Sequence, residues 1–223
     1  MRNFLDERPA SRVRLVGGRL CLDFVNSVGA RRVSANGKLT IRDEKLGDYL
    51  DLLAWARHAA ALTERESNRL ASDSASRARE AAMAFRRALR LREALYGIFS
   101  SIILKKRADR LHLDVLNDEL RLARSAERLV AGKDSFAWQW HPAGASLHRV
   151  VGMVARSAAD LLTQGDLTRL QECEGDDCGW IFEDTSRNRG RRWCDMRDCG
   201  NVAKVRRFRG RQKKAGEFQT ETE

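Results

Sequence analysis

Four cysteines near the end of the chain have the spacing of a metal site. Cys173-x4-Cys178 and Cys194-x4-Cys199 are two pairs with the same internal spacing, and fifteen residues separate them. Each pair can present two thiolates to one ion from a short bend, and four thiolates in a tetrahedron suit Zn²⁺. Because no histidine follows His148 to complete an open catalytic site, the pattern predicts one structural zinc ion bound by these four cysteines.

Other uses of the cysteines are two disulfides, a redox-active dithiol or an iron–sulfur cluster. The chain has no apolar run of about 20 residues, and its first residues lack the apolar segment of a signal peptide. We therefore expect a cytoplasmic protein without a membrane span. In a reducing compartment, clustered cysteines bind metal more often than they form disulfides. Spacing alone leaves the iron–sulfur alternative open.

The positive charge of the chain is concentrated around these cysteines. The sequence holds 42 Lys and Arg against 31 Asp and Glu, a net charge of +11. Residues 186–214 contain twelve bases and two acids, a net of +10, which leaves +1 for the other 194 residues. Arginine forks match phosphate oxygens and base edges, and a small rigid module with this charge density is typical of nucleic-acid-binding proteins. The predicted contact residues are Arg187, Asn188, Arg189, Arg191, Arg192, Asn201, Lys204, Arg206, Arg207 and Arg209.

Charge does not distinguish DNA from RNA, and a basic module can also dock on an acidic protein. An RNA-binding or protein-adaptor module is therefore the alternative to a DNA-binding regulator. An enzyme has little support, because the sequence contains no Gly-rich phosphate loop, no H-E-x-x-H and no recognisable nucleophile motif.

The elements that precede the cysteines are mainly helical. Apolar residues recur at helical spacing in four long stretches, and Thr63 and Glu66 form a capping-box pattern for a short helix between the first two. The expected long helices cover residues 44–61, 76–107, 111–129 and 147–162.

Short β elements complete this body. Residues 13–26 have the pattern of two strands around Gly17-Gly18. Residues 29–42 form a loop or small hairpin with an Asn36-Gly37 turn, and residues 136–140 alternate like a strand.

The cysteine-rich part is a different kind of sequence. We expect a strand at 180–182, a turn at 184–190, a second strand at 191–193 and a polar helix at 201–213. Together with the two cysteine bends they make a treble-clef-like or ribbon-like zinc module, which is too small to fold on an apolar core alone. The predicted organisation is a mainly α domain over 1–168, the zinc module over 169–214 and a polar tail over 215–223.

Two polar residues interrupt the apolar segment near the start of the chain. A buried Asp23 needs a partner, and Arg31 or Arg32 in the following loop can supply one. A structural pair is one interpretation. The other is a pocket in which Asp23, Asn26 and Arg31 bind a small molecule or anion as an effector.

The sequence resembles two known families. Cys173-x4-Cys178-Gly-Trp180-Ile-Phe-Glu-Asp184-Thr-Ser-Arg-Asn188 through Cys199-Gly-Asn201 resembles the CGNR zinc finger, and Gly17-Gly-Arg-Leu-Cys-Leu-Asp23-Phe-Val-Asn26-Ser resembles the start of the ABATE domain. The resemblance implies a bacterial, stress-related transcription regulator with a helical N-terminal domain and a DNA-binding zinc finger. One position departs from the pattern, because the Arg of Cys-Gly-Asn-Arg is Val202 here.

Overall fold

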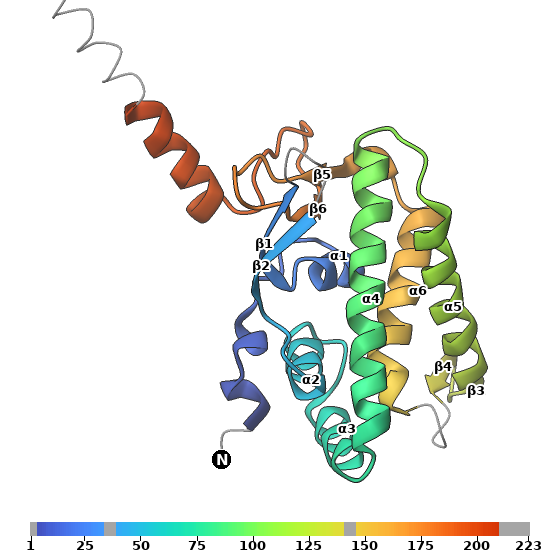
Figure 1. Cartoon of the computed structure of the whole chain (residues 1–223). Helices are drawn as coiled ribbons and strands as arrows, with labels where there is room; N and C mark the ends of the chain where they lie inside the picture. The colour runs from blue at the N-terminus through green and yellow to red at the C-terminus, as the bar shows by residue number, and fades with distance from the viewer. Residues whose placement is uncertain (1–3, 34–38, 141–145, 210–223) are drawn as a thin grey trace, which may run out of the picture.

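Three long helices lie side by side in the body of the protein. A computed structural model describes residues 4–33, 39–140 and 146–209. In it α4 (Ala78–Ile103), α5 (Arg110–Ala126) and α6 (Arg149–Gln164) pack along one another (Figure 1). The shorter α2 (Tyr49–His58) and α3 (Glu64–Ser76) lie toward the lower end of α4, and the one-and-a-half-turn α1 (Leu20–Val25) packs against α4 and α6. The mainly α prediction is confirmed.

Each long helix has the residue spacing that buries one face. In α4, Ala84, Ala88, Leu91 and Leu95 are buried and recur every three or four positions. Helix α3 starts at the predicted capping box, since Thr63 Oγ1 accepts the Glu66 N–H at 3.3 Å and the Glu66 carboxylate accepts the Thr63 N–H at 2.8 Å. The four long helices predicted from periodicity are all present: α2 and α4 are shorter at both ends than predicted, whereas α5 starts at residue 110 and α6 extends to residue 164.

Short antiparallel hairpins accompany these helices. β1 (Val28–Val33) pairs with β2 (Leu39–Glu44), so the stretch 29–42 is a hairpin, and its Asn36-Gly37 turn lies outside the described residues. β3 (Glu127–Ala131) pairs with β4 (Phe136–Trp140), which confirms the strand predicted there. No helix in the described ranges combines the length and the apolar character that crossing a membrane requires.

The two strands predicted for residues 13–26 are wrong. The chain runs extended to Gly17-Gly18 and then forms α1, in which the Asp23 N–H donates to the Arg19 carbonyl at 2.9 Å. A Cβ on residue 17 would meet Leu22 Cβ at 2.7 Å, so glycine permits this tight turn into the helix. Because Cys21, Leu22, Phe24 and Val25 are all buried, the segment is apolar on every side, and its periodicity cannot separate a buried helix from a strand.

The body and the cysteine-rich part share one hydrophobic core. Leu170 and Ile181, which flank the first cysteine pair, belong to the same buried cluster as Leu22 and Leu95. A second, smaller cluster holds Phe182 and three of the cysteines. The zinc module is therefore packed onto the body and does not hang from a linker.

Candidate metal centre and nucleic-acid interface

The four cysteine sulfurs converge on one point. The Sγ atoms of Cys173, Cys178, Cys194 and Cys199 all lie within 4.8 Å of one another, with Cys178 to Cys194 and Cys194 to Cys199 both at 3.6 Å. A tetrahedral zinc site with Zn–S bonds of about 2.3 Å has sulfur–sulfur edges of about 3.8 Å. The donor set and its spacing therefore fit one four-coordinate zinc ion, with no protein ligand missing.

Backbone turns bring the first cysteine pair into position. The Gly175 N–H donates to Cys173 Sγ at 3.4 Å, and the Cys178 N–H donates to the Gly175 carbonyl at 3.1 Å. A Cβ on residue 175 would lie 3.0 Å from Cys199 Sγ, so a glycine is needed where the two bends meet. Sequence analysis missed Gly175, although a glycine two residues after a predicted ligand is a usable signal.

The second pair is fixed by Asp195. Its carboxylate accepts the Arg197 N–H at 2.7 Å, and its carbonyl accepts the Gly200 N–H at 3.1 Å, so the chain around Cys199 forms one wide, π-type helical turn over Met196–Gly200. The Cys194 N–H also donates to Cys173 Sγ at 3.2 Å. Backbone donors to a thiolate sulfur stabilise its negative charge.

The thiols differ in how readily they ionise. Hydrogen bonds from Cys178 and then Cys194 hold the pKa of the Cys173 thiol far below its ordinary value, and the bonds to Cys173 raise the pKa of both donors. Cysteines bind zinc as thiolates, so metal binding releases the protons that the thiols carry. The fifth cysteine, Cys21, is fully buried in the body, and burial raises the pKa of its thiol to about 12, as expected for a packing residue.

The hairpin predicted between the cysteine pairs is partly wrong. A strand is present as β6 (Ile181–Glu183), but it pairs with β5 (Leu170–Glu172), and residues 191–193 are not a strand. The buried Asp184 explains the difference, because its carboxylate accepts the N–H groups of Ser186 at 2.8 Å and Arg191 at 2.9 Å and closes the chain into a loop. Burial alone would raise the pKa of Asp184, and these hydrogen bonds outweigh it and lower the pKa.

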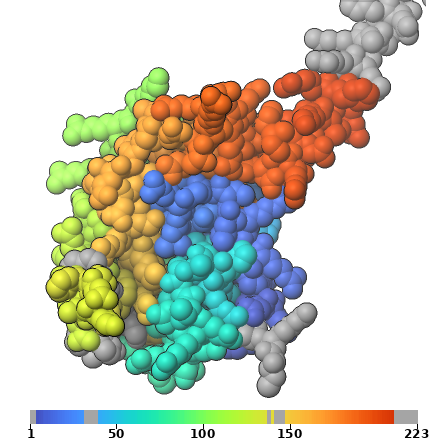
Figure 2. Space-filling view, turned by 180° about the vertical axis from the view of Figure 1, so that it is seen from behind, coloured from blue at the N-terminus to red at the C-terminus, as the bar shows by residue number. Residues whose placement is uncertain are grey.

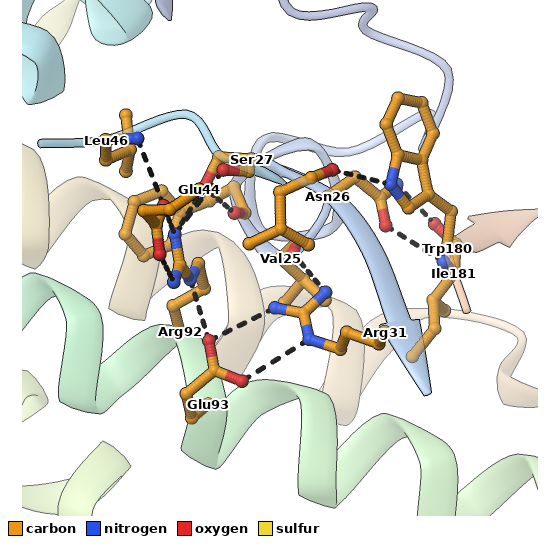
Figure 3. A network of polar contacts seen from close by, with 12 residues as sticks. Val25, Asn26, Ser27, Arg31, Glu44, Leu46, Arg92, Glu93, Trp180 and Ile181 are labelled. Carbon is orange, nitrogen blue, oxygen red and sulfur yellow. Dashed lines mark hydrogen bonds and ion pairs between the residues drawn. The ribbon is translucent and has the colours of Figure 1, made fainter. Parts of the chain in front are cut away.

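Hydrogen bonds to backbone groups, some donated or accepted by side chains, join this module to the body (Figure 3). The Asn26 amide donates to the Ile181 carbonyl at 2.8 Å and accepts the Ile181 N–H at 2.9 Å. The Arg31 N–H donates to the carbonyl of the ligand Cys178 at 2.9 Å, and Trp180 Nε1 donates to the Val28 carbonyl at 2.8 Å. The first cysteine bend is therefore held from the body side by β1 and the end of α1.

Beneath this junction lies a buried charge network. The Arg31 guanidinium is fully buried, donates to the Val25 carbonyl at 2.6 Å and pairs with Glu93 at 3.2 Å. Glu93 also pairs with the buried Arg92 at 2.8 Å, and Arg92 reaches Glu44 at 2.6 Å (Figure 3). One carboxylate of α4 thus serves two buried arginines on different elements.

These contacts account for the three residues of the predicted ligand pocket. Asn26 and Arg31 lie together at the junction, and Asp23 accepts the Gly17 N–H at 2.8 Å on the other side of α1. Burial raises the pKa of Asp23 and the backbone N–H groups of Gly17 and Val16 oppose that rise. All three side chains are thus engaged within the protein, and a ligand-binding role for them stays a prediction.

Four of the predicted nucleic-acid contact residues are engaged in contacts within the protein. Arg191 lies 4.0 Å above the Phe182 ring and donates to the Val16 carbonyl at 3.0 Å. The other three form ion pairs with acids: Arg189 with Asp166 at 3.1 Å, Arg192 with Glu174, and Arg206 with Asp176.

The remaining predicted contact residues are exposed and form no ion pair with another described residue: Arg187, Asn188, Asn201, Lys204, Arg207 and Arg209. Most of them lie on the helix over residues 201–209, which projects from the body (Figure 1). The predicted helix is thus present to 209, and residues 210–213 lie outside the described part. Its apolar side chains Val202, Val205 and Phe208 are 49%, 41% and 61% exposed.

Val202, the departure from Cys-Gly-Asn-Arg, lies over a small acidic hollow. Asp176, Asp177 and Asp198 line this hollow together with Arg206, which stands one turn further along the helix and pairs with Asp176. An arginine at 202 would face these carboxylates. Asp195, the other acid near this position, pairs with Arg14 of the body at 3.0 Å.

Comparison with known families agrees with these observations. Residues 18–165 match the family model ABATE, whose description is "Putative stress-induced transcription regulator", and residues 169–212 match the CGNR zinc finger model. A search of the curated proteins finds no match to the chain. The zinc-finger match and the sulfur geometry together identify Cys173, Cys178, Cys194 and Cys199 as a single zinc site.

Proposed function

Because this chain belongs to the ABATE family and ends in a CGNR zinc finger, we propose that it is a zinc-dependent, DNA-binding transcription regulator. The zinc module and its helix contact DNA, and the helical body is the sensor or dimerisation unit. The observation that carries this proposal is a group of exposed bases on a metal-ordered module that form no ion pair with any residue of the described ranges, namely Arg187, Lys204, Arg207 and Arg209.

The charge of these side chains suits a phosphate backbone. Lys204 and Arg207 are neighbours one turn apart on one short helix, and Arg209 projects from another side of it, so three cations project from less than three turns. A base that has no carboxylate partner keeps its full charge for phosphate and releases counterions on binding. The exposed Asn188 and Asn201 add neutral hydrogen-bonding groups, which commonly contact phosphate and sugar.

Zinc has a structural role in this proposal. The loop that carries Arg187 begins after β6, and the helix at 201–209 begins directly after the ligand Cys199, so both depend on the cysteine cluster for their position. Without the metal the four thiols lose their common centre, and a module of this size has little core of its own. The contacts of Asn26 and Arg31 extend this dependence to the body, so the two parts function together in the whole chain.

The test uses the full chain and a fluorescently labelled DNA duplex. We expect binding with a steep dependence on salt, and we expect Cys178→Ser or a strong zinc chelator to abolish it. Cys21→Ala is the matched control, because it removes the cysteine outside the zinc site. Equal binding by the zinc-free protein contradicts the zinc-dependent proposal, and preference for a structured RNA competitor favours an RNA-binding module.

A further inference from the structure

The loop between α4 and α5 carries the most compact group of bases in the body. Leu104 to Arg110 contains Lys105, Lys106, Arg107 and Arg110 against one acid. That acid, Asp109, is used locally, because its carboxylate accepts the Leu111 N–H at 2.8 Å and caps α5. Lys105, Lys106 and Arg107 are exposed and form no ion pair with another described residue.

The backbone fixes these bases in one arrangement. The Lys106 N–H donates to the Ser101 carbonyl at 2.8 Å and the Lys105 N–H donates to the Ile102 carbonyl at 2.9 Å, which is a Schellman end to α4. Lys105 has a φ of +54°, the left-handed conformation that such an end requires. The three side chains therefore project from a defined turn at the end of a 26-residue helix.

This loop lies at the same end of the molecule as the zinc module. The C-terminal half of α4 packs on β5 and β6, with the Tyr96 hydroxyl 3.3 Å from Glu172 Oε1. Figures 1 and 2 show the α4–α5 loop and the zinc module side by side at the upper end, with the helix at 201–209 on the far side of the module. Bases that form no ion pair within the described residues thus lie on three elements at this end of the molecule: the α4–α5 loop, the loop with Arg187, and the helix with Arg207 and Arg209.

We propose that the α4–α5 loop is a second DNA-contact site, at which Lys105, Lys106 and Arg107 bind the phosphate backbone of the duplex held by the zinc module. The inference rests on the proposed function and extends it to the body. A duplex carries one negative charge per about 1.7 Å of its axis, so a long regular polyanion fits bases spread over three elements. Contacts of this kind add affinity and fix orientation without recognising sequence.

An acidic protein fits this edge less well. Stable protein interfaces have an apolar, charge-depleted centre. The centre of the α4–α5 loop is charged, and its large exposed apolar side chains, Leu104 and Leu111, stand before and after the bases. Four of the predicted contact arginines of the zinc module are engaged in contacts within the protein, so bases on the body would add to the few that the module offers.

The test is a triple variant of the full chain, Lys105→Gly, Lys106→Gln and Arg107→Gln. Glycine at 105 accepts the positive φ without strain, and neither glutamine removes a backbone donor. Binding to the labelled duplex is measured over a range of salt concentrations. Each phosphate contact contributes about 0.9 to the slope of log K against log salt, so the loss of three lowers the slope by up to about 2.7. Relative to 1 M salt, where the electrostatic contribution vanishes, a slope of about 0.9 makes each contact worth roughly an eightfold gain in affinity at about 0.1 M salt, and this gain is lost when the contact is removed.

The matched control removes three bases from the opposite end. Arg121, Arg124 and Arg128 are exposed on the C-terminal turns of α5 and on β3, which lie at the lower end in Figure 1. Arg121 lies 3.9 Å from Asp118 in a solvent-exposed pair, and replacement of the three bases by Gln changes the net charge by the same amount as the loop variant. We expect the control to leave the slope unchanged. An unchanged slope in the loop variant, or an equal loss in both variants, overturns the inference while the proposed function stands.

Two further outcomes keep the two proposals distinguishable. Absence of duplex binding by the wild-type chain refutes the proposed function itself. A loop variant whose slope falls only for structured RNA refutes the assignment to DNA. If the thermal midpoint of the triple variant falls, Lys106→Gln/Arg107→Gln, which leaves the left-handed Lys105 in place, gives the same comparison with an expected slope loss of up to about 1.8.

Discussion

Asn26→Ala removes the contact that joins the body most directly to the zinc module. The Asn26 side chain satisfies both the N–H and the C=O of Ile181, at 2.9 and 2.8 Å, across 155 positions of sequence. Asn26 and Ile181 are both 0% exposed, so water cannot replace the lost amide without opening the core. Ile181 lies three residues after the ligand Cys178, which makes the zinc site sensitive to the same change.

The expected effect follows from the two groups left without partners. A buried donor or acceptor that loses its only partner costs about 1–3 kcal/mol, so the two groups of Ile181 together cost about 2–6 kcal/mol. A whole domain has about 5–15 kcal/mol of stability. The variant should therefore lose a large part of the free energy of unfolding and release zinc faster than the wild type.

Urea unfolding of the full chain measures the stability change, and the rate of zinc transfer to a chromophoric chelator measures the effect on the metal site. Asn117→Ala is the matched control, because Asn117 is exposed on α5 and its loss should change stability by less than about 0.5 kcal/mol. The role assigned to this junction would be refuted if Asn26→Ala changed the free energy of unfolding no more than Asn117→Ala does, or if it left the rate of zinc transfer unaltered.

Four further substitutions test other contacts. Glu93→Gln leaves the buried guanidiniums of Arg31 and Arg92 without their shared carboxylate. Breaking a fully buried ion pair costs about 3–5 kcal/mol of stability, and because Glu93 is partly exposed, thermal unfolding should show a smaller loss, of at least about 2 kcal/mol. Gly175→Ala places a methyl group 3.0 Å from Cys199 Sγ, so chelator competition should give a weaker zinc affinity at unchanged helix content by circular dichroism. The pKa of Asp184 is lowered in the folded protein, so the Asp184 carboxylate stabilises the fold. This stabilisation is complete above the ordinary pKa of an aspartate, near 4, and is lost as the pH falls through the lowered pKa. The urea midpoints of wild type and Asp184→Asn should therefore differ at pH 7 and converge in acid. Val202→Arg should raise the thermal midpoint by a salt-sensitive amount worth up to about 1 kcal/mol, because the new cation faces Asp176, Asp177 and Asp198, whereas Val205→Arg should not.

The sequence was sufficient where the signal is local. Paired cysteines at equal spacing predicted the zinc ligands, helical periodicity predicted α4 to α6, and Thr63 with Glu66 predicted the start of α3. Each of these patterns lies within one element or repeats a short motif. The residues that form the sequence pattern are therefore the same residues that form the metal site, the buried helix face or the helix cap.

The errors arose where distant residues decide the local structure. Residues 191–193 follow the predicted turn as the return strand of a hairpin would, yet β6 pairs with β5 because Leu170 and Ile181 enter the same core as the body. The buried Asp184 then takes the Arg191 N–H that a hairpin would have used. In the same way the helical period of α1 is hidden in the sequence, because four of its six residues are buried.

The basic residues show the same difference between local and long-range effects. The sequence places a net charge of +10 around the zinc module, but which of its arginines are available to a ligand depends on contacts with residues far away in the chain. Arg191 donates to the carbonyls of Val16 and Cys194 and covers the Phe182 ring, so moving it to a phosphate would cost contacts that hold the zinc module to the body. Arg207 and Arg209 make no such contacts among the described residues, although their type and sequence neighbourhood look alike. The proposed function therefore predicts that nucleic-acid affinity follows the bases that form no ion pair within the described residues, whether they lie on the zinc module or on the α4–α5 loop, and not the number of bases in any one segment.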